Sequence, residues 1–377
     1  MRYAVSDEIQ KWAAGVWGRL EPKLNAECRR LGAAMPYIPV DGRYEELGER
    51  SLTWWTNGFY SGMMWQMYHA TGQELYSQAA IGVEERLDQA LAEYTKLDHD
   101  LGFLWLHTAV ADYRLTKNET SRARGLHAAS LLAGRYHPIG GYIQAWNGDR
   151  EGWAIIDCLM NLPLLYWASD ELHDSALRHM AITHTDMALN YLLRPDGSCN
   201  HVVVFDPATG TYLDNPGGQG YASGSSWSRG QSWAIYGMAL AYRYTKKLEY
   251  LDAAKRAAHY FCASVSLTGY VPVIDFRAPK EPQYYDTTAG VCAACGLLEL
   301  SEYVGDMEKA LYVDSAVQML KAVDERFCYW DVSKDSIVSH GSARYDRESD
   351  REVPIIYGDY FFTEGILRLL DKDFLIW

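Results

Sequence analysis

A regular alternation of two kinds of helical segment constrains this chain more than any other feature. Segments with an apolar stripe at helical spacing begin near Asp7, Glu74, Glu119, Asp170, Leu248 and Met307. Between them lie six segments that are almost entirely apolar and begin near Asn57, Asp100, Ile155, Gly230, Thr287 and Gly358. A helix that is apolar all round must be buried on every side. The sequence therefore predicts six helical hairpins, each with one inner and one outer helix.

Twelve such helices can close into an all-α (α/α)6 barrel, with an inner ring of six helices inside an outer ring of six. An open solenoid of the same hairpins is the competing architecture. The inner segments carry Gly and Ala where helices would crowd near an axis, which favours closure. We expect residues 1–377 to form a single barrel domain, because the sequence shows no domain boundary and no low-complexity segment.

The acidic balance of the chain argues against several partners. The formal net charge is −14, so neither nucleic acid nor an anionic membrane surface is an expected partner. No run of 18 apolar residues occurs, and the acidic start of the chain is unlike a secretory signal. Seven scattered cysteines are typical of reduced thiols, which favours a cytoplasmic location. The oligomeric state, monomer or dimer, is left open.

The motif search gives no reason to expect a metal or a cofactor. Cys292 and Cys295 have a CxxC spacing, but no second Cys or His pair accompanies them, so helix packing explains them better. Zinc-ligand spacings, phosphate loops and dinucleotide motifs are absent from the sequence. The eleven histidines do not cluster along the chain.

Long linkers lead into the inner helices at about 138–153, 196–229, 266–286 and 329–357. They should gather at one mouth of the barrel, at the N-terminal ends of the inner helices. Helix N-termini present unpaired N–H groups and a positive dipole end, which suit an anionic ligand. We therefore expect the functional site at this mouth.

Three groups of polar residues near these helix starts could carry chemistry. The Asp98-His99-Asp100 cluster is explained only in part by helix capping, since one cap needs one Asp. Asp157 is expected inside an apolar helix, where burial would raise its pKa and keep it protonated as a general acid. The competing interpretation of Asp157 is a structural hydrogen bond to a neighbouring helix.

The third group surrounds a glycine-rich stretch. It offers Gln219 as an amide, Arg229 as a partner for a carboxylate, and Trp233 as an aromatic wall. Packing of this loop on the barrel rim is the alternative. His201, Gln144, Trp146 and Trp55 add further polar and aromatic groups at linker mouths, although each has an ordinary core interpretation as well.

Seven strings in consistent order, from about residue 50 onward, resemble glycoside hydrolase family 88, the unsaturated glucuronyl hydrolases. They are WTNGFYSGMMW (55–65), DHDLGFLW (98–105), GYIQAWNG (141–148), IIDCLMNLPLLYWAS (155–169), GSSWSRGQSWAIYGMALAY (224–242), YYDTTAGVCAACGLLEL (284–300) and YGDYFFTEGILRLL (357–370). The resemblance implies an (α/α)6 barrel from a mostly cytoplasmic bacterial family. Its members act on lyase-generated oligosaccharides that carry a 4,5-unsaturated uronate at the non-reducing end.

The same resemblance implies roles for individual residues. Asp157 matches the family's catalytic acid/base, and Asp100 matches the second essential carboxylate, with His99 beside it. His201, Gln219, Arg229 and Trp233 match positions of the uronate subsite, and Trp55 and Trp146 match the aromatic wall. The implied reaction is hydration of the C4=C5 vinyl ether, in which Asp157 protonates C4 and water adds at C5, guided by Asp157 or His201.

Other functions remain as alternatives at this stage. An unsaturated rhamnogalacturonyl hydrolase would share the barrel and the chemistry but take a pectin-derived aglycone. An N-acylhexosamine epimerase on the same barrel would need several convergent histidines, which the spacing does not show. A non-enzymatic helical scaffold would leave Asp157 and Arg229 as unexplained buried charges.

Overall fold

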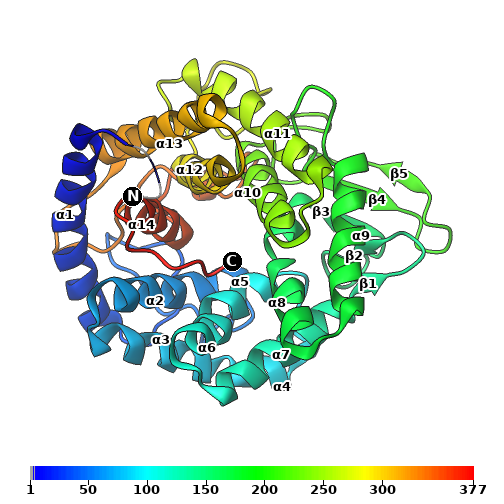
Figure 1. Ribbon diagram of the computed structural model, residues 1–377, viewed down its shortest axis with the longest axis horizontal. Helices are drawn as coiled ribbons and strands as arrows, with labels where there is room; N and C mark the ends of the chain where they lie inside the picture. The colour runs from blue at the N-terminus through cyan, green and yellow to red at the C-terminus, as the bar shows by residue number, and fades with distance from the viewer. Residues whose placement is uncertain (1–2, 4) are drawn as a thin grey trace.

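The computed structural model describes residue 3 and residues 5–377, and its helices form two concentric rings (Figure 1). The inner ring consists of α2 (Phe59–Thr71), α5 (Leu101–Trp105) continued by α6 (Ala111–Thr116), α8 (Pro163–Leu172), α10 (Ser228–Thr245), α12 (Thr287–Leu300) and α14 (Ile356–Leu369). The outer ring consists of α1 (Asp7–Leu31), α3 (Glu74–Arg86), α7 (Glu119–Ala133), α9 (Ser175–Tyr191), α11 (Leu248–Ser266) and α13 (Asp306–Phe327). The predicted (α/α)6 barrel is confirmed.

The ring is closed, which excludes the open solenoid. Helix α14 packs against α12 on one side and α2 on the other, so the last inner helix meets the first. In the outer ring, α1 is joined to α13 because Arg19 and the Trp12 indole both contact the Asp324 carboxylate, at 2.8 and 3.0 Å. The inner helices are buried along almost their whole length, as their apolar sequences require.

Local signals fix several helix ends. The Ser6 side chain accepts from the Ile9 N–H at the start of α1, as expected of an N-cap. The outer helix expected near Asp170 instead begins at Ser175. Asp174 caps it by accepting from the Ala176 N–H, and Asp170 belongs to the last turn of α8.

The expectation of helix from Ile155 onward is wrong. Residues Trp153–Ile155 form strand β3, followed by a 3-10 turn at Ile156–Met160, and α8 begins only at Pro163. Proline lacks an N–H and suits the first turn of a helix, which explains the later start. Asp157 therefore lies in the 3-10 turn, not inside an apolar helix.

In the described part of the chain, five short strands lie at one side of the barrel (Figure 1). Strand β1 (Tyr136–His137) pairs with β2 (Tyr142–Ile143). Strand β3 pairs antiparallel with β4 (Val202–Phe205), which in turn pairs with β5 (Tyr212–Asp214). The sequence analysis did not predict these strands, whose two to four residues are too short to show an alternating pattern.

Two further expectations concern membranes and thiols. No helix in the described part of the chain is long and apolar enough to cross a membrane. All seven cysteines are free, and Cys292 and Cys295 are fully buried in α12, as expected for helix packing.

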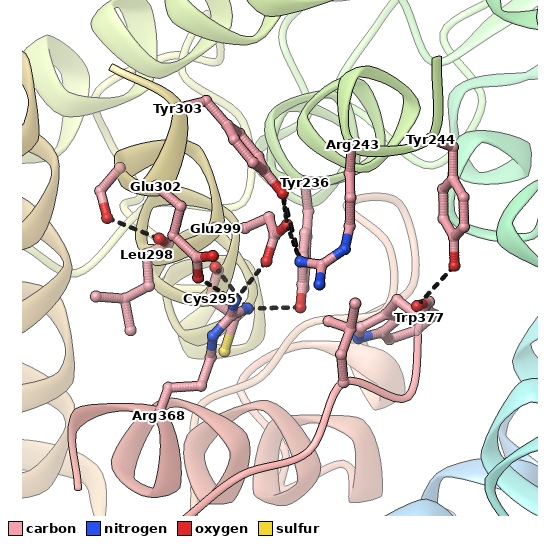
Figure 2. A network of polar contacts seen from close by, with 12 residues as sticks. Tyr236, Arg243, Tyr244, Cys295, Leu298, Glu299, Glu302, Tyr303, Arg368 and Trp377 are labelled. Atoms are coloured by element: carbon pink, nitrogen blue, oxygen red, sulfur yellow. Dashed lines mark hydrogen bonds and ion pairs between the residues drawn. The ribbon is translucent and has the colours of Figure 1, made fainter. Parts of the chain in front are cut away.

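The end of the barrel opposite the linkers is held by a buried ionic network (Figure 2). Arg368 of α14 is fully buried and bonds Glu299 of α12, while its other contacts reach Glu302 and Glu364, each at 3.4 Å. The Tyr236 hydroxyl accepts from Arg368 at 2.8 Å and links α10 to the same network. Three neighbouring inner helices are therefore joined through one guanidinium.

We predict that Arg368→Ala destabilises the protein by about 3–5 kcal/mol, since it leaves Glu299 buried with much of its charge uncompensated. Urea unfolding at pH 7 measures the change. Arg243→Ala is the control, because Arg243 also binds Glu299 but its side chain is 34% exposed. Equal losses for both variants would contradict the assigned role of Arg368.

Candidate active site

A cavity of about 520 Å³ opens at the mouth where the linkers meet the inner helices. Its wall comes from segments far apart in the sequence, and seven predicted site residues line it: Trp55, His99, Asp100, Trp146, Asp157, His201 and Gln219. The linkers at 138–153, 196–229 and 329–357 contribute to it, whereas the linker at 266–286 lines a different cavity.

Pairing of β3 with β4 brings Asp157 and His201 together. Ile155 is registered opposite Val202, and the Ile156 N–H continues the ladder by donating to the His201 carbonyl at 3.0 Å. The next residue, Asp157, consequently faces the His201 ring, with 3.4 Å between Oδ1 and Nε2. The Asp157 side chain is only 12% exposed, so this short ladder sets the position of a buried carboxyl group.

Asp100 stands at the N-terminus of α5 but does not cap the helix with its side chain. Its Oδ1 atom lies 3.3 Å from His99 Nε2 and 3.4 Å from Asn161 Nδ2. The Asn161 Oδ1 atom in turn accepts from the Phe103 N–H, which fixes the amide orientation. Capping therefore does not explain Asp100, whose carboxyl group faces the cavity.

The two carboxyl groups have opposite pKa shifts. Burial raises the pKa of Asp157, but the neighbouring His201 ring, Arg229 and His99 outweigh burial, so its pKa lies below the ordinary value. The expectation that burial keeps Asp157 protonated is therefore wrong for the unliganded protein. The sequence could not reveal this, because His201 and Arg229 come from distant segments.

Burial also raises the pKa of Asp100, and here the negative charges of Asp98 and Asp157 raise it further. Asn161 and Arg135 act in the opposite direction but do not outweigh burial. The pKa of Asp100 lies well above the ordinary value as a result. Of the two carboxyl groups in the unliganded site, Asp100 therefore binds a proton more readily than Asp157.

Arg229 is a buried cation without a carboxylate partner within ion-pair distance, as far as residue 3 and residues 5–377 show. It is 1% exposed, and only its Nη2 atom is bonded, to the Ala343 carbonyl at 2.7 Å. The guanidinium lies over the rings of Trp227, Tyr357 and Trp55, at 4.4, 5.0 and 5.6 Å. A buried charge with two unbonded nitrogens is costly unless an anion completes it.

The place of this cation relative to the cavity follows from shared contacts. The Gln219 amide, which lines the cavity, donates to the same Ala343 carbonyl at 2.8 Å. Trp55 also lines the cavity and carries Arg229 over its ring. Arg229 therefore lies just behind the wall that Gln219 and Trp55 form.

Besides Arg229, two predicted residues lie away from the cavity lining. Trp233 is fully buried and packs against Phe103 and Phe361 beneath the site. The Gln144 amide donates to the Trp146 carbonyl and so supports the loop that presents that ring.

The rest of the wall includes Asp98 of the predicted Asp98-His99-Asp100 cluster, together with Trp54, Gly218 and Arg344. The sequence analysis missed the remaining residues of the wall, namely Thr53, Arg150, Trp153, Ile155, Val202 and Pro216. Arg150 lies over the rings of Trp146 and Trp153, at 4.9 and 5.5 Å, and forms a cationic edge to the cavity. The mixture of basic and aromatic residues between 146 and 153 was the available signal. The Arg344 guanidinium is already paired with Asp346.

Asp98, His99 and Asp100 also bring three ligand atoms within 4.8 Å of one another. Two of these residues have other partners nearby: Asp98 Oδ1 accepts from the Asp100 N–H, and His99 Nδ1 contacts the Ala145 carbonyl. These contacts account for the cluster as part of the carboxyl site.

Together the fold and the site define an α/α barrel with a carboxyl pair in an aromatic cavity and a cation behind its wall. The model of Glycosyl Hydrolase Family 88 matches residues 37–268. An unsaturated glucuronyl hydrolase of Bacillus sp. (strain GL1) is 36% identical over 90% of this chain and 92% of its own length. The chain belongs to glycosyl hydrolase family 88.

Other relatives agree in sequence and in structure. The unsaturated chondroitin disaccharide hydrolase of Streptococcus pyogenes serotype M1 is 34% identical over 84% of this chain and 81% of its own length. The crystal structure of the Bacillus sp. GL1 enzyme superposes with a TM-score of 0.88, at 33% identity over 93% of this chain and 95% of that one. A Streptococcus agalactiae mutant complexed with dGlcA-GalNAc6S gives a TM-score of 0.83, at 26% identity over 100% and 96% of the two chains.

We predict that Gly218→Ala lowers activity by displacing His201. Gly218 has φ +62°, and an added Cβ would lie 2.0 Å from His201 Nδ1. Gly224→Ala is the matched control, since Gly224 has φ +75° in the same loop but nothing lies within 4 Å of an added Cβ. Both variants should lose about 1 kcal/mol or more of stability through backbone strain. Only Gly218→Ala should also lower kcat, and equal kcat values in the two variants would contradict this placement of His201.

Proposed function

We propose that this protein is an unsaturated glucuronyl hydrolase. It releases the non-reducing-end 4,5-unsaturated glucuronate from oligosaccharides that polysaccharide lyases produce. The observation that carries this proposal is Arg229, a buried cation with two unbonded nitrogens beside an aromatic cavity. A uronate carboxylate supplies the missing anion, and the neighbouring sugar faces suit the rings of Trp55 and Trp146.

The reaction is hydration of the C4=C5 vinyl ether of the sugar ring. A proton adds to C4 while positive charge develops at C5 and the ring oxygen, and water then adds at C5. The resulting hemiketal opens and releases the rest of the oligosaccharide. Asp157 delivers the proton to C4, and its carboxylate, next to His201, then takes a proton from the attacking water.

Binding of the uronate prepares Asp157 for this role. Arg229 is one of the groups that hold the pKa of Asp157 low in the unliganded site. When the substrate carboxylate pairs with Arg229, the guanidinium no longer favours the Asp157 anion, and water leaves the cavity. Both changes raise the pKa of Asp157, so that it gains its proton in the substrate complex.

The aglycone is a glycosaminoglycan or similar uronate-containing fragment. The relatives that support this choice are named for glucuronyl and chondroitin disaccharide substrates. The alternative, an unsaturated rhamnogalacturonyl substrate, involves the same hydration chemistry and is distinguished by the assay below. The oligosaccharide is the only partner proposed; nucleic acid and membranes are not proposed partners of this acidic protein.

We further propose that residues 1–377 act as one catalytic domain in a bacterial cytoplasm. Contacts between α1, α13 and α14 join both ends of the described chain into the barrel. Seven free thiols suit a reducing compartment. Fractionation of bacterial cells that carry the gene would test the location.

The test is the loss of enuronate ultraviolet absorbance on a panel of lyase products. The panel contains unsaturated disaccharides from hyaluronan, sulfated and unsulfated chondroitin, heparin and gellan, together with unsaturated rhamnogalacturonan. Turnover of a glucuronyl product supports the proposal and ranks the aglycones. Turnover of rhamnogalacturonan alone would assign the alternative activity, and no turnover at all would overturn the proposal.

In the same assay, Asp157→Asn should lower kcat by about 10²–10⁴-fold or more, because the amide cannot deliver the proton. The circular dichroism spectrum should stay unchanged, since asparagine has the same shape. A kcat within a factor of a few of the wild-type value would exclude Asp157 as the proton donor.

Removal of the buried cation should act on binding and catalysis together. Arg229→Met is expected to lower kcat/KM by about 10–150-fold, the effect of one charge-assisted interaction of 1.5–3 kcal/mol. Arg150→Met changes the same charge at the exposed edge of the cavity and should have a smaller effect. Equal losses in the two variants would argue that general electrostatic attraction, and not a bound carboxylate, explains the role of Arg229.

A further inference from the structure

The two site histidines have opposite hydrogen-bonding patterns. His99 Nδ1 lies 2.8 Å from the Ala145 carbonyl oxygen, which can only accept. This nitrogen must therefore carry a proton. In the neutral ring the other nitrogen, Nε2, then offers a lone pair to Asp100 Oδ1, 3.3 Å away. No hydrogen bond is formed at Nε2 in this structure, and one that closes across this contact to the neutral ring takes its proton from the carboxyl group.

His201 shows the reverse arrangement. Its Nδ1 atom accepts from the Gln219 N–H at 3.0 Å, so this nitrogen carries no proton. The proton of the neutral ring must then sit on Nε2, which faces Asp157 Oδ1 at 3.4 Å. Neither atom forms a hydrogen bond within the described residues, and one that closes across this contact favours the ionised carboxylate. Contacts of this length are common before a ligand closes an active site.

Backbone contacts hold the tautomer of His99 in place. The Ala145 carbonyl accepts from three donors: His99 Nδ1, the His99 N–H at 3.1 Å and Arg135 Nη2 at 3.1 Å. Arg135 also donates to the Gln144 carbonyl at 3.0 Å and to Asn147 Oδ1 at 2.8 Å. These contacts fix the orientation of the Ala145 carbonyl toward His99 Nδ1. Arg135 is therefore a positioning residue, because it holds the carbonyl that sets the His99 tautomer.

We propose that the resting enzyme stores its catalytic proton on Asp100, beside the unprotonated Nε2 of His99, while Asp157 rests as a carboxylate beside the protonated Nε2 of His201. The proposal deepens the hydrolase function above and rests on it for the role of Asp157. His99, His201 and Arg135 act as positioning residues that keep the two carboxyl groups in different protonation states.

The charged groups around the pair agree with this distribution. Asp100 faces the acidic groups Asp98 and Asp157, and the cation Arg135 acts on it more weakly than its burial. Asp157 faces the cation Arg229 from α10, the ring of His201 from the residue before β4, and the ring of His99 from two residues before α5. The thiol of Cys158, which also lies beside both carboxyl groups, has a pKa well above its usual value because of burial and so stays neutral.

Substrate binding then moves the stored proton within the site. The uronate pairs with Arg229, one proton leaves Asp100 and one proton binds Asp157, through a water molecule or sugar hydroxyl held between them. The negative charge passes from Asp157 to Asp100, so no proton is taken from solvent. After C4 receives the proton, Asp157 regains one from the attacking water, and product release returns that proton to Asp100.

The direct test is infrared difference spectroscopy of the unliganded protein at pH 7. The spectrum of wild type minus Asp100→Asn should contain a protonated carboxylic-acid band, which the variant lacks. The spectrum of wild type minus Asp157→Asn should contain a carboxylate band instead. Other buried acids such as Glu27 cancel in both differences. A carboxylate band in the Asp100→Asn difference would overturn the proposal, whether or not the protein turns over any substrate.

A matched pair of variants tests the role of His99 through the pH dependence of kcat/KM, which reports the free enzyme. In His99→Gln the new amide oxygen can replace Nε2 as an acceptor for Asp100, so this variant should retain the wild-type alkaline limb. The shorter amide of His99→Asn retains only a donor to Ala145, so its alkaline limb should move to lower pH. If the alkaline limb lies one pH unit lower, kcat/KM at a pH on that limb is about tenfold below the wild-type value. Identical limbs in the two variants would overturn the role of His99.

Discussion

Two buried arginines show what the rest of this barrel depends on, which is the cost of placing charge among apolar helices. Arg368, at one end, is fully buried and is surrounded by the acidic side chains of Glu299, Glu302 and Glu364. Arg229, near the other end, is just as buried but bonds only a backbone carbonyl. The first arrangement is complete and stabilises the ring. The charge of Arg229 is balanced only when an anion binds next to it, and so the cavity beside it becomes a site for acidic sugars.

The alternation of apolar and amphipathic segments was enough to predict the two rings, because burial on all sides leaves few alternatives for a wholly apolar helix. It was not enough for the residues around Asp157. Three-residue β3 carries no periodic signal, and its partner β4 follows only after the whole of α8 and α9. Tertiary pairing therefore decided the backbone there, and a helix-like composition from Ile155 to Ala168 concealed a strand and a 3-10 turn.

The residue types of the site could largely be predicted, since seven of the ten candidates line one cavity. Their protonation states could not. An isolated buried Asp should hold its proton, yet Asp157 meets His201 and Arg229, and Asp100 meets Asp98. Similarly, nothing in the sequence around Arg135 shows that its guanidinium orients a carbonyl bound by His99. Such properties depend on which groups the fold brings together, and a pattern of residues along the chain does not contain that information.

The most direct measurement of the central claim is a crystal structure of the Asp157→Asn variant with an unsaturated glucuronyl disaccharide bound. The account predicts that the uronate carboxylate lies against Arg229 and Gln219, with C4 of the sugar facing residue 157. A carboxylate bound instead at the exposed Arg150 edge, with Arg229 still uncompensated, would contradict it.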